Sequence, residues 1–193
     1  MTSFIENLEW RRAVKHFAPG PVNTEPILKA MLNAPSSFGL QPYKIAVVRD
    51  AAIKSKLQPV SYGQPQVAEC DTLFVICARK DVEARAEEFL TTTGAEGLRG
   101  MLTGFLTYLP DKVAWAAKQA YIALGFGLAA AAEIRVASCP MEGFSSSDVS
   151  KILELPDTLV PVCYLAVGRK VESDNEEAPP RFRFPASDLV LEY

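Results

Sequence analysis

The chain has 193 residues, 49% of them hydrophobic and 22% charged, a composition typical of one globular domain with a single sizeable core. Its net charge of −3 argues against a protein whose whole surface attracts nucleic acid or an anionic membrane. The four cysteines include no CxxC pair and one histidine accompanies them, so we expect no metal site. No secretory signal precedes them, and we expect a cytoplasmic protein.

The first half of the chain predicts helices and two strands. Apolar residues at helical spacing predict a helix over residues 4–10, and Thr24 can cap a second helix that ends at residues 35–37. Two short runs rich in β-branched residues predict central strands buried on both faces, with Asp50 capping a short helix between them. These runs are residues 44–49 and 72–78.

The third quarter of the chain predicts further helices. Charges at helical spacing occupy residues 81–94, and the glycine-punctuated stretch 94–110 is a candidate lid or variable insertion. A long helix is expected from about Asp111 to about Ile134. It contains the apolar run 120–132, which is too short to span a bilayer, so we expect a buried helix.

The last quarter predicts a strand over residues 135–139, a helix capped by Ser146 or Ser147 that ends near residue 155, and a strand over residues 158–168. Helices outnumber strands, and their order is not a regular βαβ alternation. The chain is therefore predicted to be an α+β protein, with a mixed central sheet flanked by helices.

The chain ends in a polar, proline-bearing tail, residues 169–187, followed by the strand-like sequence LVLEY. So few apolar side chains cannot build a core of their own, and a terminal strand would need a sheet edge to pair with. A partner subunit could supply that edge.

Two basic clusters stand at opposite ends of this acidic chain: Arg11, Arg12 and Lys15 near the start, and Arg181 and Arg183 near the end. Arginine forms paired hydrogen bonds with phosphate oxygens, and lysine adds a point charge, so the two clusters could converge on one phosphate. Alternatively, both clusters are solvated surface charges.

Two loops could hold a ligand. Residues 35–43 follow a helix with two serines and a glycine, and such a loop exposes backbone amides and hydroxyl groups; it could equally be a plain turn. In residues 140–144, Gly143 permits a flat ligand to approach the backbone closely, and here too a turn is the alternative. The sequence contains no GxGxxG or GxxxxGK[ST] motif for phosphate binding.

Taken in order, the motifs resemble the nitroreductase family. They are RRAVKHF, PSSFGLQPY, YGQPQV, WAAKQAY, PMEGF and PRFRF, and they extend over essentially the whole chain. The resemblance is closest to the group of FMN-containing NAD(P)H nitroreductases and dihydropteridine reductases. It implies a single domain over residues 1–193 and a homodimer with two FMN sites at the interface. It also implies that residues 169–193 reach across the partner subunit.

The resemblance assigns roles to individual residues. The FMN phosphate and ribityl chain would be held by Arg11, Lys15, Arg181 and Arg183. The partner subunit would contribute Pro35, Ser36 and Ser37. The chain departs from the family pattern at Ala13, where serine is usual, and at Gly39, where asparagine is common. Both departures remove a hydrogen bond to FMN and predict weaker binding.

The flavin ring itself would lie against the loop after residue 139. The backbone of Glu142 and Gly143 would face the ring nitrogen that accepts hydride, and Pro140 and Met141 would lie under the ring. Gln64 would meet the flavin with its side chain. The substrate pocket would be bordered by Phe105 or Tyr108.

The function implied is transfer of hydride from NADH or NADPH, through FMN, to small electron-poor acceptors such as nitroaromatics or quinones, with ping-pong kinetics. No catalytic side chain is needed, because the flavin carries the chemistry. Relatives also act on enones, pteridines, flavins or halogenated aromatics. A protein that stores or senses flavin without fast turnover, or an interaction protein without a cofactor, are the alternatives from other classes.

Overall fold

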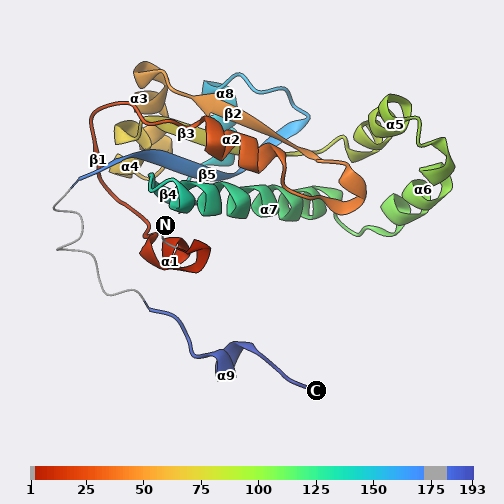
Figure 1. The fold of residues 1–193 in the computed structure, drawn as a ribbon. Coiled ribbons are helices and arrows are strands. Elements are labelled where there is room, and N and C mark those ends of the chain that lie inside the picture. Colours follow the sequence, from red (N-terminus) through yellow and green to blue (C-terminus); the bar gives the residue numbers. More distant parts are fainter. Residues whose placement is uncertain (1–2, 172–181) are drawn as a thin grey trace.

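The structure is a computed structural model that describes residues 3–171 and 182–193. In these residues the chain forms one sheet covered by helices on both faces (Figure 1). The strands are β1 (Phe17–Ala18), β2 (Tyr43–Val48), β3 (Thr72–Arg79), β4 (Ala137–Met141) and β5 (Leu159–Lys170). The helices are α1 (Phe4–Trp10), α2 (Glu25–Leu32), α3 (Ala51–Val60), α4 (Pro65–Glu69), α5 (Val82–Thr93), α6 (Arg99–Tyr108), α7 (Lys112–Glu133), α8 (Ser146–Ile152), α9 (Ala186–Leu189) and the short 3-10 helices η1 (Ser37–Gly39) and η2 (Glu96–Leu98).

The sheet has the strand order β1-β5-β3-β2, and β4 also pairs with β5. Every pairing of these strands is antiparallel, and a bridge between Ala13 and Ser138 adds one parallel contact. The predicted α+β fold with a central sheet flanked by helices is therefore confirmed, and the sheet is more uniformly antiparallel than the expected mixed sheet.

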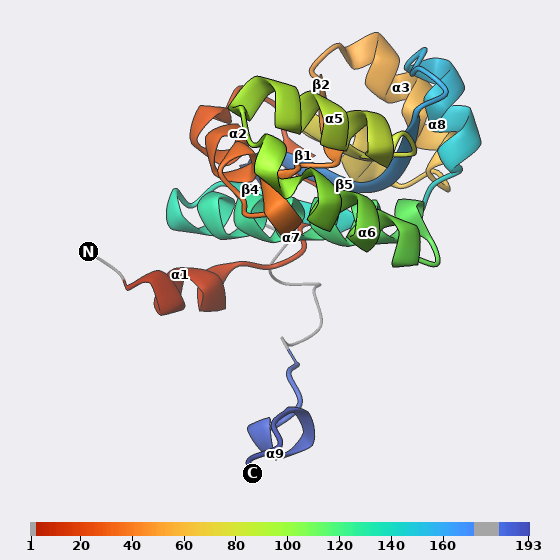
Figure 2. The same ribbon diagram turned by 90° about the vertical axis from the view of Figure 1, so that its right-hand side faces the viewer.

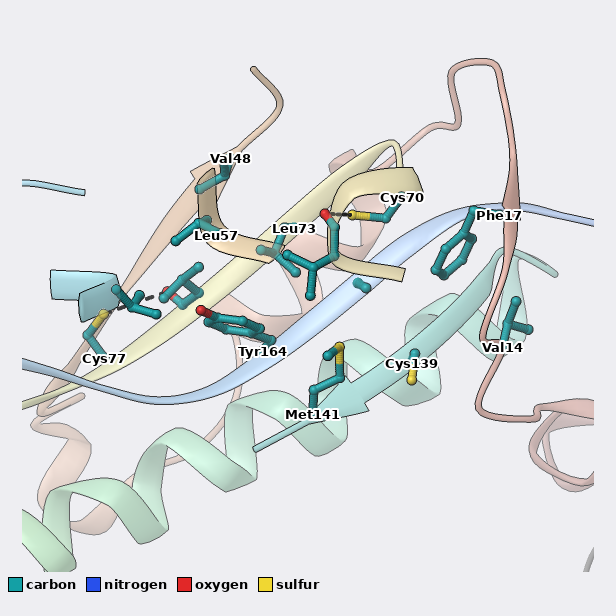
Figure 3. Close-up of a cluster of buried hydrophobic side chains, with 14 of the residues drawn as sticks. Val14, Phe17, Val48, Leu57, Cys70, Leu73, Cys77, Cys139, Met141 and Tyr164 are labelled. Carbon is teal, nitrogen blue, oxygen red and sulfur yellow. Dashed lines mark hydrogen bonds between the residues drawn. The ribbon is translucent and has the colours of Figure 1, made fainter. Parts of the chain in front are cut away.

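Alternation along the central strands divides the core between the two faces of the sheet. On β3, Leu73 and Val75 point to one face, whereas Phe74 and Ile76 point to the other. The first face is covered by α3, α4 and α8, and Figure 3 shows this cluster with Tyr164 of β5 at its centre. The second face is covered by α2 and α7.

A third cluster joins α5 and α6 to the beginning of α7. The two helices extend from one end of the sheet (Figures 1 and 2) and pack through Leu90, Leu102 and Leu106 against Trp115. The stretch that the sequence marks as a candidate lid is thus largely helix α6, seated on buried side chains.

Local signals place most helices correctly. Asp50 accepts a hydrogen bond from Ile53 N and caps α3, as predicted. The long helix α7 begins where expected, and Asp111 caps it by accepting a hydrogen bond from Ala114 N. Thr24 stands at the start of α2, but its hydroxyl accepts a hydrogen bond from Arg49 (3.1 Å) and caps nothing. The Thr24 hydroxyl thus bonds to a residue distant in the sequence and not to the backbone of its own helix.

Several boundaries differ from the sequence prediction. Helix α2 ends at Leu32 rather than at residues 35–37, β4 begins two residues later than expected, and α8 is preceded by Ser145 and ends at Ile152. Strand β2 lies at the end of the sheet and is partly exposed, so the prediction that it is buried on both faces was wrong. One edge of β2 is free because only β3 pairs with it.

The end of the chain also differs. Instead of a strand, residues 182–193 contain the short helix α9 followed by an irregular end, and all of them are exposed. A strand needs hydrogen-bonding partners, and no edge of this chain's own sheet reaches the segment.

Helix α7 fits so closely between α2 and the sheet that Gly127 has no room for a side chain. A Cβ atom there would lie 2.8 Å from Met31 Cγ and 2.9 Å from Leu165 Cδ2, both fully buried. We expect Gly127→Ala to lower the free energy of unfolding by about 1–3 kcal/mol through overpacking. The control Gly104→Ala, in α6 with no atom within 4 Å, should raise it by roughly 0.5–1 kcal/mol. Urea unfolding of both variants measures this, and equal stabilisation of both would contradict the packing described.

No helix in the described part of the chain is long and apolar enough to cross a membrane.

Candidate active site

The first group of predicted site residues lies along the edge of β4 that does not pair with β5. Val14 N donates to Ser138 O (3.2 Å), and the burial of Val14 turns the side chains of Ala13 and Lys15 outward. Lys15 Nζ lies 3.8 Å from Cys139 Sγ. A basic segment from the start of the chain therefore lies beside the strand that carries the PMEGF motif.

A tight turn follows β4 and is anchored on both sides of Gly143. Phe144 N donates to Glu142 O (3.0 Å), and the Phe144 ring stacks on Tyr164 with 4.0 Å between the ring centroids. Met141 points its side chain into the core (Figure 3), so only its backbone faces the site. The core thus fixes the position of the turn.

Gln64 holds this turn from the side. Its Nε2 atom donates to Gly143 O (2.9 Å) and to Ser61 O (3.1 Å). A Cβ atom on Gly143 would lie 2.9 Å from the same Nε2, so a larger residue would displace the amide. Within the described residues the Gly143 N–H donates no hydrogen bond, which leaves it available to a ligand.

The Glu142 carboxylate is held by helix α7. It accepts a hydrogen bond from the Tyr121 hydroxyl, which also lies 3.4 Å from Val162 O. Burial, followed by this bond to Glu142, raises the pKa of Tyr121, so the phenol stays protonated and remains a donor. Glu142 is therefore oriented by its neighbour.

The second group surrounds the loop after α2. Ser37 N donates to Gln119 Oε1 (2.9 Å) on α7, and Ser36 Oγ accepts a hydrogen bond from Gln41 N (2.8 Å). Phe38 and Gly39 have positive φ angles of 56° and 71°. The loop is thus held in a defined conformation with its serines at the surface of the fold.

The two residues expected at a substrate pocket behave differently. Phe105 packs with its ring centroid 5.2 Å from that of Phe38 and 5.6 Å from that of Trp115, so it borders the serine loop. Tyr108 is 89% exposed at the end of α6.

The two groups lie on opposite sides of α7. Ser37 is hydrogen-bonded to Gln119, and Glu142 to Tyr121. Residues two positions apart on a helix are separated by about 200° around its axis, so their side chains point in nearly opposite directions. Of the second basic cluster, Arg183 is exposed and donates to Phe182 O, whereas Arg181 lies outside the described residues. The described part of one chain therefore does not bring all the predicted site residues together.

The cysteines contribute no reactive thiolate here. Burial raises the pKa of Cys70, Cys77 and Cys163 to about 12 and raises that of Cys139 as well, although the charge of Lys15 acts in the opposite direction. Among the described residues no group of His, Cys, Asp and Glu could hold a metal ion.

Three contributors to the site were missed by the sequence reasoning: Gln66, Tyr121 and Cys139. Each was present in or beside a quoted motif, but a motif does not say which of its side chains point to one another. The sequence also did not reveal that Gln119 would accept a hydrogen bond from Ser37 N.

Comparisons with known proteins agree with this architecture. The sequence pattern of the nitroreductase family matches residues 8–169. The chain is 33% identical to a Thermus thermophilus protein named "NADH dehydrogenase", over 94% of this chain and 91% of that one. It is 30% identical to the "Putative NAD(P)H nitroreductase" of Staphylococcus haemolyticus, over 97% and 96% of the two chains.

A solved structure has the same fold. It is that of the "putative nitroreductase in complex with FMN" from Exiguobacterium sibiricum, with a TM-score of 0.83 at 20% identity over 100% of this chain and 98% of that chain. The antiparallel sheet between α2 and α7 on one face and α3, α4 and α8 on the other is therefore a nitroreductase-like fold. The chain belongs to the nitroreductase family.

Proposed function

We propose that this protein is an FMN-dependent oxidoreductase that transfers hydride from NADH or NADPH to small electron-poor acceptors, such as nitroaromatics or quinones, by a ping-pong mechanism. The observation that carries the proposal is the turn after β4. Its Gly143 N–H is unused, its carbonyls are held by Gln64 and Phe144, and the charge of Lys15 lies along the same strand edge.

The residues fit FMN. Gly143 lets a flat ring approach the backbone, where a Cβ atom would instead collide with Gln64. Lys15 supplies a positive charge for the carbonyl edge of the ring, and Arg11 supplies one for the phosphate. When bound, FMN would accept hydride and pass it on. The chain's own part is to bind, to orient the ring and to stabilise negative charge, for which Pro140 and the Glu142–Gly143 backbone are positioned.

The complete site would form between two copies of the chain. The exposed face of α7 carries Tyr121, Ile122 and Phe126, an apolar surface of the kind that oligomer contacts cover. Because the serine loop and the β4 turn lie on opposite sides of α7, a partner packed on this face would bring its own Ser36 and Ser37 toward the turn. This supports a homodimer.

The tail would complete the same dimer. Strand β2 has one free edge, and a groove of about 390 Å³ beside it is lined by the apolar side chains Leu28, Leu32, Tyr43, Ile45 and Val47, together with Gln41, Lys44 and Arg85. In the tail, Leu189, Val190 and Leu191 are 69%, 54% and 78% exposed. Arg169 and Lys170 belong to β5 and pair with β1 of the same chain. We therefore propose that the chain beyond Lys170 crosses to the partner and that its apolar end occupies this groove.

Removing the apolar side chains of the tail should weaken the dimer. Each buried aliphatic side chain contributes about 1.5–3 kcal/mol, so Leu189→Asp with Leu191→Asp should raise the dimer dissociation constant at least a hundredfold. Sedimentation velocity over a concentration series measures this. Glu192→Gln is the control and should leave the dissociation constant unchanged. A dimer of undiminished affinity in the double variant would place the tail elsewhere.

The experiment that tests the function is an absorbance spectrum of the purified protein under nitrogen, before and after addition of NADPH and then NADH. We expect a flavin spectrum that bleaches within seconds, followed by recovery when a quinone or nitroaromatic is added. Bleaching only over many minutes would favour a protein that stores or senses flavin. A protein that stays colourless after FMN is added would overturn the proposal.

A further inference from the structure

The orientation of the Gln64 amide decides what the β4 turn can offer a ligand. Its Nε2 atom faces two carbonyl oxygens, Ser61 O and Gly143 O, which fixes the nitrogen toward the turn. The oxygen end of the amide must then meet a donor. If the amide rotated by half a turn, two carbonyl oxygens would face its oxygen, and the hold on Gly143 would be lost.

Gln66 supplies that donor. It lies in α4, two residues after Gln64, and is 2% exposed. Its Nε2 atom donates to Gln64 Oε1 (3.1 Å) and lies 4.0 Å from Cys139 Sγ. Lys15 Nζ approaches the same sulfur to 3.8 Å. The buried amide therefore touches both parts of the site, the Gly143 turn through Gln64 and the Lys15 segment through Cys139.

The remaining atom of the Gln66 amide shows that stability alone does not explain this residue. Gln66 Oε1 is buried and has no hydrogen-bond partner among the described residues. An unpaired buried acceptor is unfavourable, so this end of the amide does not stabilise the fold. The amide nitrogen is the useful end of this side chain, because it donates to Gln64 Oε1 and so orients the Gln64 amide.

We infer that Gln66 is a positioning residue for the flavin site. It fixes the Gln64 amide, which holds the Gly143 carbonyl and keeps the Gly143 N–H directed at the ligand. The inference rests on the proposed function, since the ligand is FMN. Gln66 itself does not touch the flavin, and its effect passes through Gln64.

The test is a double-mutant cycle on FMN binding, with Gln64→Leu, Gln66→Leu and the double variant. FMN titration of the apoprotein, followed by flavin fluorescence, gives the dissociation constants. We expect Gln66→Leu to weaken binding about tenfold, and the double variant to bind within about twofold of Gln64→Leu alone, because both changes break one chain of contacts. The visible absorbance band of the bound flavin should shift in Gln66→Leu as well.

The matched control is Gln58→Leu, which removes another glutamine that braces the same segment by donating to Gly63 O (3.3 Å). It should leave both the dissociation constant and the spectrum unchanged. Urea unfolding of the apoproteins checks that each variant folds. If Gln66→Leu does not, Gln66→Met has a similar length and volume and a thioether that cannot donate, and the same weakening is expected.

The outcomes separate the two proposals. A wild-type protein that takes up no FMN overturns the proposed function. A wild-type protein that binds FMN, together with Gln66→Leu that binds it equally well or a double variant whose effects simply add, overturns the role of Gln66 alone.

Discussion

Ile122→Glu is expected to give a folded protein that is monomeric and has lost its FMN. Ile122 is 39% exposed on the outer face of α7, between Tyr121 and the 42% exposed Phe126. In a dimer packed on this face, burying the new carboxylate would cost several kcal/mol of desolvation, which the exposed Lys118 one turn earlier on α7 would offset only in part. Because the partner would supply the serine loop, separation of the subunits removes half of each flavin site. Sedimentation velocity and the flavin absorbance should therefore change together.

The control carries the same charge on the opposite face of the sheet. Ser55→Glu lies on an exposed position of α3 and should leave both the dimer and the bound flavin intact. If Ile122→Glu stayed dimeric, the contact surface would lie elsewhere. If it became monomeric but kept FMN at undiminished affinity, one chain would hold the cofactor without its partner.

Lys15→Met should weaken FMN binding and lower the reduction potential of the bound flavin. The Lys15 ammonium lies beside the edge of β4, where we place the carbonyl end of the ring, and the reduced flavin carries negative charge there. A charged hydrogen bond of this kind is worth about 1.5–3 kcal/mol. The loss corresponds to a potential lowered by roughly 30–60 mV for a two-electron couple. Anaerobic titration against a reference dye measures it.

Two further variants make the result specific to this charge. Lys15→Arg keeps a cation at the site and should shift the potential by less than half as much. Lys151→Met removes a lysine on α8 that pairs with Asp148 and should shift nothing. If the reduction potential were unchanged in Lys15→Met, Lys15 would not lie near the flavin ring and could contribute only to phosphate binding.

The family assignment did not depend on the structure. The order of six short motifs along the chain resembled the nitroreductase family, and the match over residues 8–169 confirmed it. The class of fold followed from the count and order of the elements.

The sequence by itself determined the features that rest on neighbouring residues. Asp50 and Asp111 cap their helices because a carboxylate reaches backbone amides three positions ahead, and β3 is a buried strand because its run of apolar residues has no polar face to expose. Only the tertiary structure decided the features that depend on distant residues. It placed β2 at an edge of the sheet. The Thr24 hydroxyl accepts a hydrogen bond from Arg49 instead of capping α2, and residues 182–193 form no strand.

The site divides along the same line. Gly143 and Lys15 could be singled out from their motifs. Gln66, a glutamine in a short helix, is recognised as part of the site only from its contacts with Gln64 and Cys139, and Cys139 is 73 residues away in the sequence. The separation of the serine loop from the β4 turn was likewise invisible in the sequence, because it depends on which sides of α7 meet each segment. Hydrogen bonds of long sequence separation form only once the sheet and α7 have packed, and no local pattern specifies them.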